Sequence, residues 1–227
     1  HLDKVCEIAK KYDFVPLIWS DMFFRPWNDG VYCMMKGKRE MPKGFKDAIN
    51  PDVIPVYWDY YSADAGRYKK NIKTDKIFGK PVYFAGGALS WKGFAPDNKW
   101  SMEATAAALE ACNECGVDGV LFTVWGDDGG ECSKYGVLPC LMFAAEAVKG
   151  NTDMDSIKIK FKEITGCDFD DFMVIDKFDK LSGKHRFNPS KYLLYNDFFM
   201  GTSDVRCSKD DNLYYKDLAE EIANIER

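Results

Sequence analysis

Several absences narrow the function of this 227-residue chain. It has no uninterrupted apolar run of about 18 residues, which a membrane-spanning helix requires. It has no basic surplus: the net charge is −5, whereas a nucleic-acid surface needs a stripe of Lys and Arg. It has two histidines, His1 and His185, so a zinc site or a His-based triad has few candidate residues. We therefore expect no membrane or nucleic-acid partner, no metal and no cofactor.

The cysteines favour a reducing compartment. Eight are scattered through the predicted helices and strands, and the single CxxC pair, Cys112 and Cys115, lies inside a helical pattern. A zinc site would need a second pair or nearby histidines, so packed, reduced thiols are the better interpretation. No secretory signal is visible, and we expect a cytoplasmic protein. The opening residues HLDKVCEIAKKY already read as an amphipathic helix, with Leu2, Val5, Ile8, Ala9 and Tyr12 on one face, so we expect a start inside a larger protein.

Strand and helix patterns alternate along the first 150 residues. We predict strands at 14–19, 53–58, from Val82 and at 119–125, and helices at 2–12, 63–73, 101–115 and 137–149. Strands that are apolar on both faces, with helices between them, predict a parallel sheet covered by helices. Residues 153–227 contain no Trp and read as amphipathic segments at 153–164, 168–181, 190–199 and 211–225. We therefore predict two domains, an α/β domain at 1–150 and a helical region at 151–227.

Three strand ends share one motif. The stretches VPLIWSD (15–21), VIPVYWD (53–59) and FTVWGDDGGE (122–131) each place an aromatic ring two residues before an aspartate. Residues i and i+2 of an extended chain point to the same face, so each pair offers a flat ring beside a carboxylate. Ligand-binding groups of (β/α)8 barrels lie at these strand ends, which favours a barrel, although a doubly wound open sheet stays possible.

A ring beside a carboxylate suits a sugar, because the ring stacks on C–H faces while the carboxylate accepts from hydroxyls. A single aromatic of this kind would more simply close the core. The repetition at four strand ends, with Trp91 at the third, favours a carbohydrate site. A metal site built from Asp127, Asp128 and Glu131 is the weaker alternative, because the spacing fits no known Ca²⁺ loop.

The succession IWSDMF, VYWDYY, GGALSW and TVWGDDGGE resembles the second half of the catalytic barrel of glycoside hydrolase family 20, the β-N-acetylhexosaminidases. The resemblance covers about residues 1–150, and it implies that the four strands are barrel strands five to eight. It is closest to the branch with a helical C-terminal region. The implied fold is half of a (β/α)8-type barrel, about four βα units, followed by an α-helical region.

The resemblance also implies roles for six substrate-binding residues. Trp19 and Trp91 would form walls around the sugar, and Tyr57 would hydrogen-bond the acetamido oxygen, with Asp59 beside it at the rim. Trp125 would form the floor, and Asp127 would hold the hydroxyls at positions 4 and 6. The family often has Glu where this chain has Asp127, so the preference for one 4-epimer does not carry over.

The resemblance implies substrate-assisted retaining hydrolysis, in which the acetamido group is the nucleophile and the acid is the Glu of an Asp-Glu dipeptide. This chain contains no Asp-Glu dipeptide, so we expect no catalytic residue and no turnover from it alone. Two alternatives remain: a non-catalytic carbohydrate-binding module, and another glycosidase half-barrel that uses Asp127 or Glu131. Half a barrel would leave an inner face and strand edges uncovered, so we expect a homodimer or association with the missing half.

Overall fold

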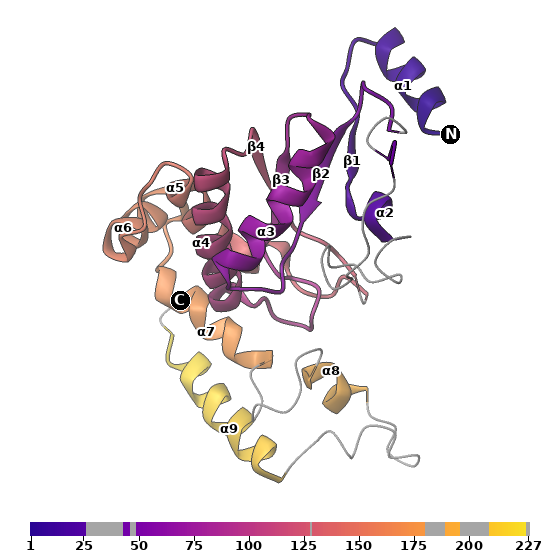
Figure 1. The fold of residues 1–227 in the computed structure, drawn as a ribbon. Helices are drawn as coiled ribbons and strands as arrows, with labels where there is room; N and C mark the ends of the chain where they lie inside the picture. The colour runs from indigo at the N-terminus through magenta and orange to yellow at the C-terminus, as the bar shows by residue number, and fades with distance from the viewer. Residues whose placement is uncertain (26–42, 46–48, 128, 180–188, 196–208, 226–227) are drawn as a thin grey trace. The chain divides into compact units, whose positions relative to one another are not determined.

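The computed structural model describes most of the chain as two compact units (Figure 1). The described residues are 1–25, 43–45, 49–127, 129–179, 189–195 and 209–225. The first unit comprises His1–Gly86 and Ala104–Phe122, and the second comprises Gly87–Glu103 and Thr123–Arg227. Neither unit ends at residue 150, so the predicted domain boundary there remains a prediction.

A four-stranded parallel sheet in the order β1-β2-β3-β4 forms the centre of the first unit, apart from the last residues of β3 and β4. The strands are β1 (Leu17–Trp19), β2 (Ile54–Trp58), β3 (Tyr83–Gly87) and β4 (Gly119–Thr123). In the register, Trp19 pairs with Val56, and Trp58 pairs with Ala85. All four predicted strands are confirmed, although the last one ends at Thr123, two residues earlier than expected.

The ends of two helices in this unit have identifiable capping residues. They are α1 (Leu2–Lys11), the short α2 (Asp21–Phe24), α3 (Ala65–Asp75), the 3-10 helix η3 (Lys76–Phe78) and the second part of α4 (Asn98–Cys115). The side chain of Asp64 caps α3 by accepting from the Gly66 N–H at 2.8 Å. Gly79 ends η3 with a φ of 64°, a left-handed conformation that glycine adopts without strain.

The core of the first unit lies between the sheet and helices α3 and α4 (Figure 1). Its largest fully buried side chains include Tyr68 and Ile72 from α3 and Phe84 from β3. Cys112 packs into the same cluster, as expected for a helix cysteine. Burying side chains of this size contributes about 1.5–3 kcal/mol each, so the helices are fixed to this face of the sheet.

The opposite face of the sheet is not bare, which corrects our expectation for the two central strands. Side chains alternate along a strand, so Val56 and Ala85 point away from the face that Tyr57 and Phe84 share with the helices. Both are nevertheless buried, at 2% and 0% exposure. At these two positions the second face of the sheet is therefore shielded from solvent.

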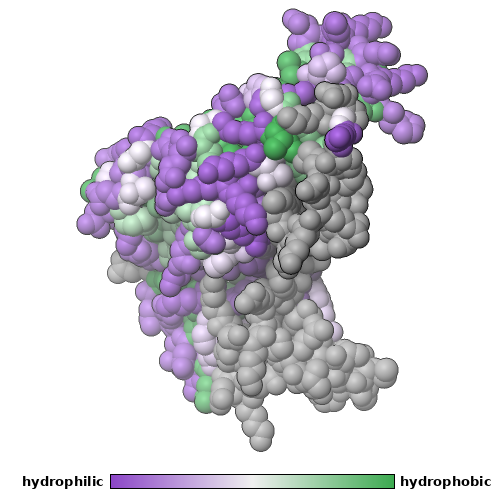
Figure 2. All heavy atoms as spheres, viewed as in Figure 1, coloured by the Kyte–Doolittle hydropathy of each residue, from purple (hydrophilic) through white to green (hydrophobic). Residues whose placement is uncertain are grey.

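Apolar side chains are exposed on α1 and beside it. Only Cys6 and Ala9 of this helix are buried, whereas Val5 and Ile8, which we expected on the packed face, are about half exposed. The adjoining Val15 and Leu17 are exposed as well. Figure 2 shows apolar atoms at the surface beside this N-terminal helix. Since β1 is the edge strand of the sheet that the described residues form, this region combines an apolar surface with a sheet edge.

The second unit is mainly helical, and its described residues after 153 form helices within or next to the predicted amphipathic segments. Besides the first part of α4, its elements are the 3-10 helices η4 (Lys134–Val137) and η5 (Asp176–Asp179), and the α-helices α5 (Leu138–Ala147), α6 (Met154–Thr165), α7 (Phe169–Ile175), α8 (Pro189–Leu194) and α9 (Lys209–Ala223). Phe143, Ile157, Phe161 and Phe169 form the core among α5, α6 and α7. Of the described helices, none has the length and apolarity needed to cross a membrane.

One buried carboxyl group in the first unit, that of Asp75, has an unusual protonation state. Asp75, at the end of α3, has no exposed surface. Burial, aided by the nearby charge of Asp21, raises the pKa of Asp75 to about 8, although the Ser20 hydroxyl partly opposes the shift. The neutral, protonated carboxyl is therefore the form that the folded protein holds at neutral pH.

We expect this carboxyl to make the protein less stable as the pH rises. An unfolded Asp ionises near pH ~4, so between about pH 4 and 8 the folded state keeps a proton that the unfolded state has released. The free energy of unfolding then falls by up to about 1.4 kcal/mol per pH unit. In Asp75→Asn this contribution is absent, so urea titrations from pH 5 to 8 should show the variant gaining stability relative to wild type. The exposed Asp155→Asn serves as a control; equal pH profiles for Asp75→Asn and wild type would contradict the assignment.

Candidate functional site at the strand ends

At the end of β2, Tyr57 and Asp59 lie on one side of the strand, as the i, i+2 argument predicts. The Tyr57 hydroxyl donates to Asp59 Oδ2 at 3.2 Å and accepts from Asn71 Nδ2 at 2.9 Å. Arg67 binds the same carboxylate oxygen through Nε at 3.0 Å and Nη2 at 2.8 Å. The Tyr61 N–H donates to the other oxygen, Asp59 Oδ1, at 2.9 Å. Both predicted residues therefore have their polar atoms engaged within the first unit.

Tyr57 is part of the core between the sheet and the helices. It is 3% exposed, and its ring contacts Tyr68 and Phe84 at centroid distances of 6.3 and 5.6 Å. Burial, with the neighbouring Asp59 charge, raises the pKa of the Tyr57 hydroxyl well above its usual value. Tyr57 is therefore a neutral hydrogen-bonding group enclosed on the helix side of the sheet.

The next residue, Trp58, faces the other way and was not among the predicted site residues. Its indole Nε1–H donates to Asp21 Oδ1 at 3.0 Å, and its ring stacks on Tyr60 at a centroid distance of 5.2 Å. Trp58 and Tyr60 thus form an aromatic i, i+2 pair on the face opposite Tyr57 and Asp59. The signal was present in the sequence as VYWDYY, where the aromatic pair Trp58 and Tyr60 overlaps the pair Tyr57 and Asp59.

The first strand end differs from the pattern we expected. Trp19 is the last residue of β1, and the chain turns into α2 at Asp21, so the pair is not extended. Trp19 is half-buried, whereas Asp21 is 7% exposed and its carboxylate binds Trp58. Here the carboxylate accepts from an aromatic residue of the neighbouring strand.

The other three predicted residues belong to the second unit, in loops beyond β3 and β4. Trp91 is 5% exposed, Trp125 is half-buried and Asp127 is exposed. The two loops are joined by Ser90, whose hydroxyl donates to the Trp125 carbonyl at 2.8 Å, and by Lys134. Lys134 Nζ donates to the same carbonyl and lies 3.2 Å from Ser90 Oγ. The backbone of Trp125 is therefore fixed, while Asp127 keeps solvent-facing surface.

Glu131, the candidate acid or metal ligand, is bound by two partners in α8 and just after it. Its carboxylate forms an ion pair with Lys191 and accepts from the Tyr195 hydroxyl at 2.6 Å. These hydrogen bonds, Lys191 first, hold the pKa of Glu131 below its usual range. An ionised carboxylate with both oxygens engaged is a poor general acid.

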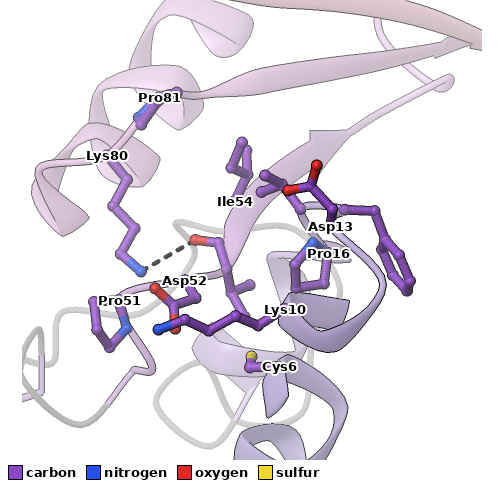
Figure 3. A pocket seen from close by; sticks show the side chains of 12 residues that line it. Cys6, Lys10, Asp13, Pro16, Pro51, Asp52, Ile54, Lys80 and Pro81 are labelled. Atoms are coloured by element: carbon purple, nitrogen blue, oxygen red, sulfur yellow. Dashed lines mark hydrogen bonds between the residues drawn. The ribbon is translucent and has the colours of Figure 1, made fainter. Parts of the chain in front are cut away.

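A pocket of about 350 Å³ lies at the opposite, N-terminal ends of the strands (Figure 3). Lys80 extends across it and donates to the carbonyls of Val53, at 3.1 Å, and Asn50. Burial raises the pKa of the Cys6 thiol in the same wall, which makes it a weak nucleophile. Lys80 thus links the segment before β3 to the segment before β2 through hydrogen bonds. Residues at the N-terminal ends of parallel strands commonly contribute to stability rather than to catalysis.

Asp128 and His185, which the sequence analysis considered, fall outside the described residues. Within the described ranges, no group of three or more His, Cys, Asp or Glu residues could hold a metal ion. The six cysteines of those ranges are free thiols.

Comparison with protein families relates the end of the chain to a glycoside hydrolase family. Residues 170–227 match the family model of the Glycoside Hydrolase 20C C-terminal domain, which supports a relation to glycoside hydrolase family 20 and suggests a glycosidase parent. A search of curated proteins finds no match to the chain. The matched residues include most of α7 and all of η5, α8 and α9.

The buried network at Tyr57 predicts a loss of stability when its hydroxyl is removed. In Tyr57→Phe the Asn71 amide loses its acceptor and Asp59 loses one donor, inside a core that offers no replacement. We expect the free energy of unfolding to fall by about 1–3 kcal/mol, measured by urea denaturation. Tyr135→Phe, which changes a mostly exposed tyrosine, should have no effect. An unchanged stability in Tyr57→Phe would show that the hydroxyl faces solvent or a ligand instead.

Proposed function

We propose that the chain is the C-terminal part of a glycoside hydrolase that removes terminal β-linked N-acetylhexosamine from glycans. The observation that carries the proposal is the family match at residues 170–227, which follows a parallel sheet with tryptophans at its strand ends. The match and the strand-end motifs come from different parts of the chain, so they support the same family independently. The proposed parent fold is the (β/α)8 barrel.

Within this proposal the strand-end residues divide into two groups. Trp19, Trp125 and Asp127 keep accessible surface, and we assign them direct contact with the sugar. Trp91, Tyr57 and Asp59 are buried, so we assign them the support of the surfaces that face the sugar. The Asp127 carboxylate would accept hydrogen bonds from sugar hydroxyls, which are charge-assisted and therefore strong.

The mechanism that the family implies needs an Asp-Glu dipeptide, which this chain does not contain. We propose that another part of the protein supplies it, and that the substrate's acetamido group acts as the nucleophile. The alternative that uses Glu131 as an acid is disfavoured by its ion pair with Lys191. A pure binding module remains the second candidate, and an Asp-Glu dipeptide in the preceding strand of the protein would exclude it.

We expect Trp125→Ala and Asp127→Asn to weaken substrate binding in the full-length enzyme. Loss of the stacking ring should raise KM about ten- to a hundredfold, because burying an aromatic side chain contributes about 1.5–3 kcal/mol. The measurement is hydrolysis of a nitrophenyl N-acetylglucosaminide. Val148→Ala, which changes an exposed side chain after α5, is the control.

Wild-type kcat/KM in both variants would show that these residues have a structural role only. Turnover by the 227-residue chain itself, abolished by Asp127→Asn, would instead favour a glycosidase that uses this carboxylate directly.

The exposed apolar residues of α1 and β1 support a second part of the proposal. Val5, Ile8, Val15 and Leu17 are 49%, 48%, 58% and 45% exposed, and Leu17 lies in β1, the edge strand of the described sheet. We propose that this edge is covered by a second copy or by the other half of the barrel, because sheet edges of this kind readily pair.

Light scattering on the isolated chain should therefore give a mass above that of the monomer at micromolar concentration. Ile8→Lys and Leu17→Lys place a charge in the contact and should shift the population toward monomer. Ile159→Lys, at an exposed site on α6, should not. A stable monomer with cooperative unfolding would contradict the association.

A further inference from the structure

We call the residues 176–179 and 189–195 together the C-terminal segment, and its second part contacts the loop after β4. Glu131 ends the loop Gly126–Glu131, which carries Asp127, and its carboxylate is held by Lys191 and Tyr195. Lys191 is only 11% exposed and Glu131 is 31% exposed, so water screens this ion pair less than a surface pair. The Asp127 carbonyl accepts from the Gly130 N–H at 3.3 Å, which links the two described parts of this loop. A constraint on Glu131 is therefore passed to Asp127 over a short path.

The same segment contacts the loop after β3, which runs from Trp91 to Asp97. Asp179, at the end of η5, accepts from the Ala95 N–H at 3.0 Å and from the Ser190 N–H at 3.2 Å, and it also binds the Ser190 hydroxyl. A Cβ atom at Gly93 would stand 2.0 Å from Asp179 Oδ2, so the carboxylate occupies the space that a side chain there would need.

Side chains from this segment also contact the rings and the helix beside the β3 loop. The Tyr195 ring meets Phe94 edge-on at 5.7 Å, and Lys191 Nζ lies 5.7 Å above the same ring. Asp176 binds Asn98 Nδ2 and the Lys99 N–H, both at 2.8 Å, and so fixes the start of α4 directly after the loop. Lys191 and Tyr195 each contact both loops, which a tail resting on the surface would not require.

We propose that Asp179, Lys191 and Tyr195, acting through Glu131 and Gly93, are positioning residues that set the geometry of the two strand-end loops. The inference rests on the proposed function for its catalytic consequence, but the constraint on the loops can be measured without any substrate. The C-terminal helical region then fixes the loops that carry sugar-binding residues, in addition to stabilising the fold. A displacement of about 1 Å in such a site costs up to about a hundredfold in rate.

The first experiment measures amide hydrogen exchange in the chain, without ligand. Glu131→Gln removes the charge that pairs with Lys191, and Asp179→Asn weakens the acceptor for Ala95. Each variant should raise exchange tenfold or more in its own loop, 126–131 or 91–97, without changing the core peptides of α5 and α6. Lys158→Met removes an ion pair with Asp170 between α6 and α7, at 2.7 Å, and is the matched control.

A steric variant and a charge reversal make the test specific. Gly93→Ala should displace Asp179 and raise exchange in loop 91–97, as Asp179→Asn does. The double variant Glu131→Lys with Lys191→Glu should restore protection of loop 126–131, whereas either single change should not. Unchanged exchange in both loops for Glu131→Gln, Asp179→Asn and Gly93→Ala would overturn the proposal.

The second experiment measures hydrolysis of a nitrophenyl N-acetylglucosaminide by the full-length enzyme. Glu131→Gln and Asp179→Asn should raise KM about tenfold with a smaller change in kcat, and the charge reversal should recover most of the loss. Loosened loops with unaltered kinetics would overturn the catalytic role of the constraint. Loosened loops in an enzyme without hexosaminidase activity would refute the proposed function and leave the positioning role in place.

Discussion

The alternation of side chains along β2 determines which residues meet on each face of the sheet. Tyr57 and Trp58 are neighbours in sequence, yet the pleat sends them to opposite faces of the sheet. Tyr57 enters the aromatic core with Tyr68 and Phe84, where its hydroxyl is satisfied by Asn71 and Asp59. Trp58 is left on the other face, where Asp21 binds its indole. A shift of one residue in the register would exchange the two rings and leave two buried polar groups without partners.

The family match and the contacts of the C-terminal helices involve the same residues. The matched residues 170–227 contain Asp176, Asp179, Lys191 and Tyr195, which contact the segments after β3 and β4. Polar contacts to those particular loops exceed what a helical region needs for its own stability. Within the second unit, these contacts agree with the proposal that the C-terminal helices hold the loops after β3 and β4 in place.

The sequence predicted the elements well because their signals are local. Short apolar runs located the four strands, and Gly79 and Gly116, in left-handed conformations, end helices close to where the helical patterns stop. The site was predicted less completely because its contacts are not local. Asn71 and Arg67 reach Tyr57 and Asp59 from α3, and Lys191 reaches Glu131 across 60 positions of sequence, which no periodicity reveals. The Trp19–Asp21 pair failed for a local reason, since the chain starts a helix where we expected it to stay extended.

The close approach of Asp179 to Gly93 has a consequence for how such sequences diverge. The carboxylate fills the volume beside the glycine Cα, so a larger residue at 93 is tolerated only when the side chain at 179 becomes shorter. Positions 93 and 179 are far apart in the sequence, but a substitution at one changes which residues are tolerated at the other. Among homologous proteins, substitutions at these positions should therefore occur together, and a glycine paired with an aspartate should mark the lineages that share this loop geometry.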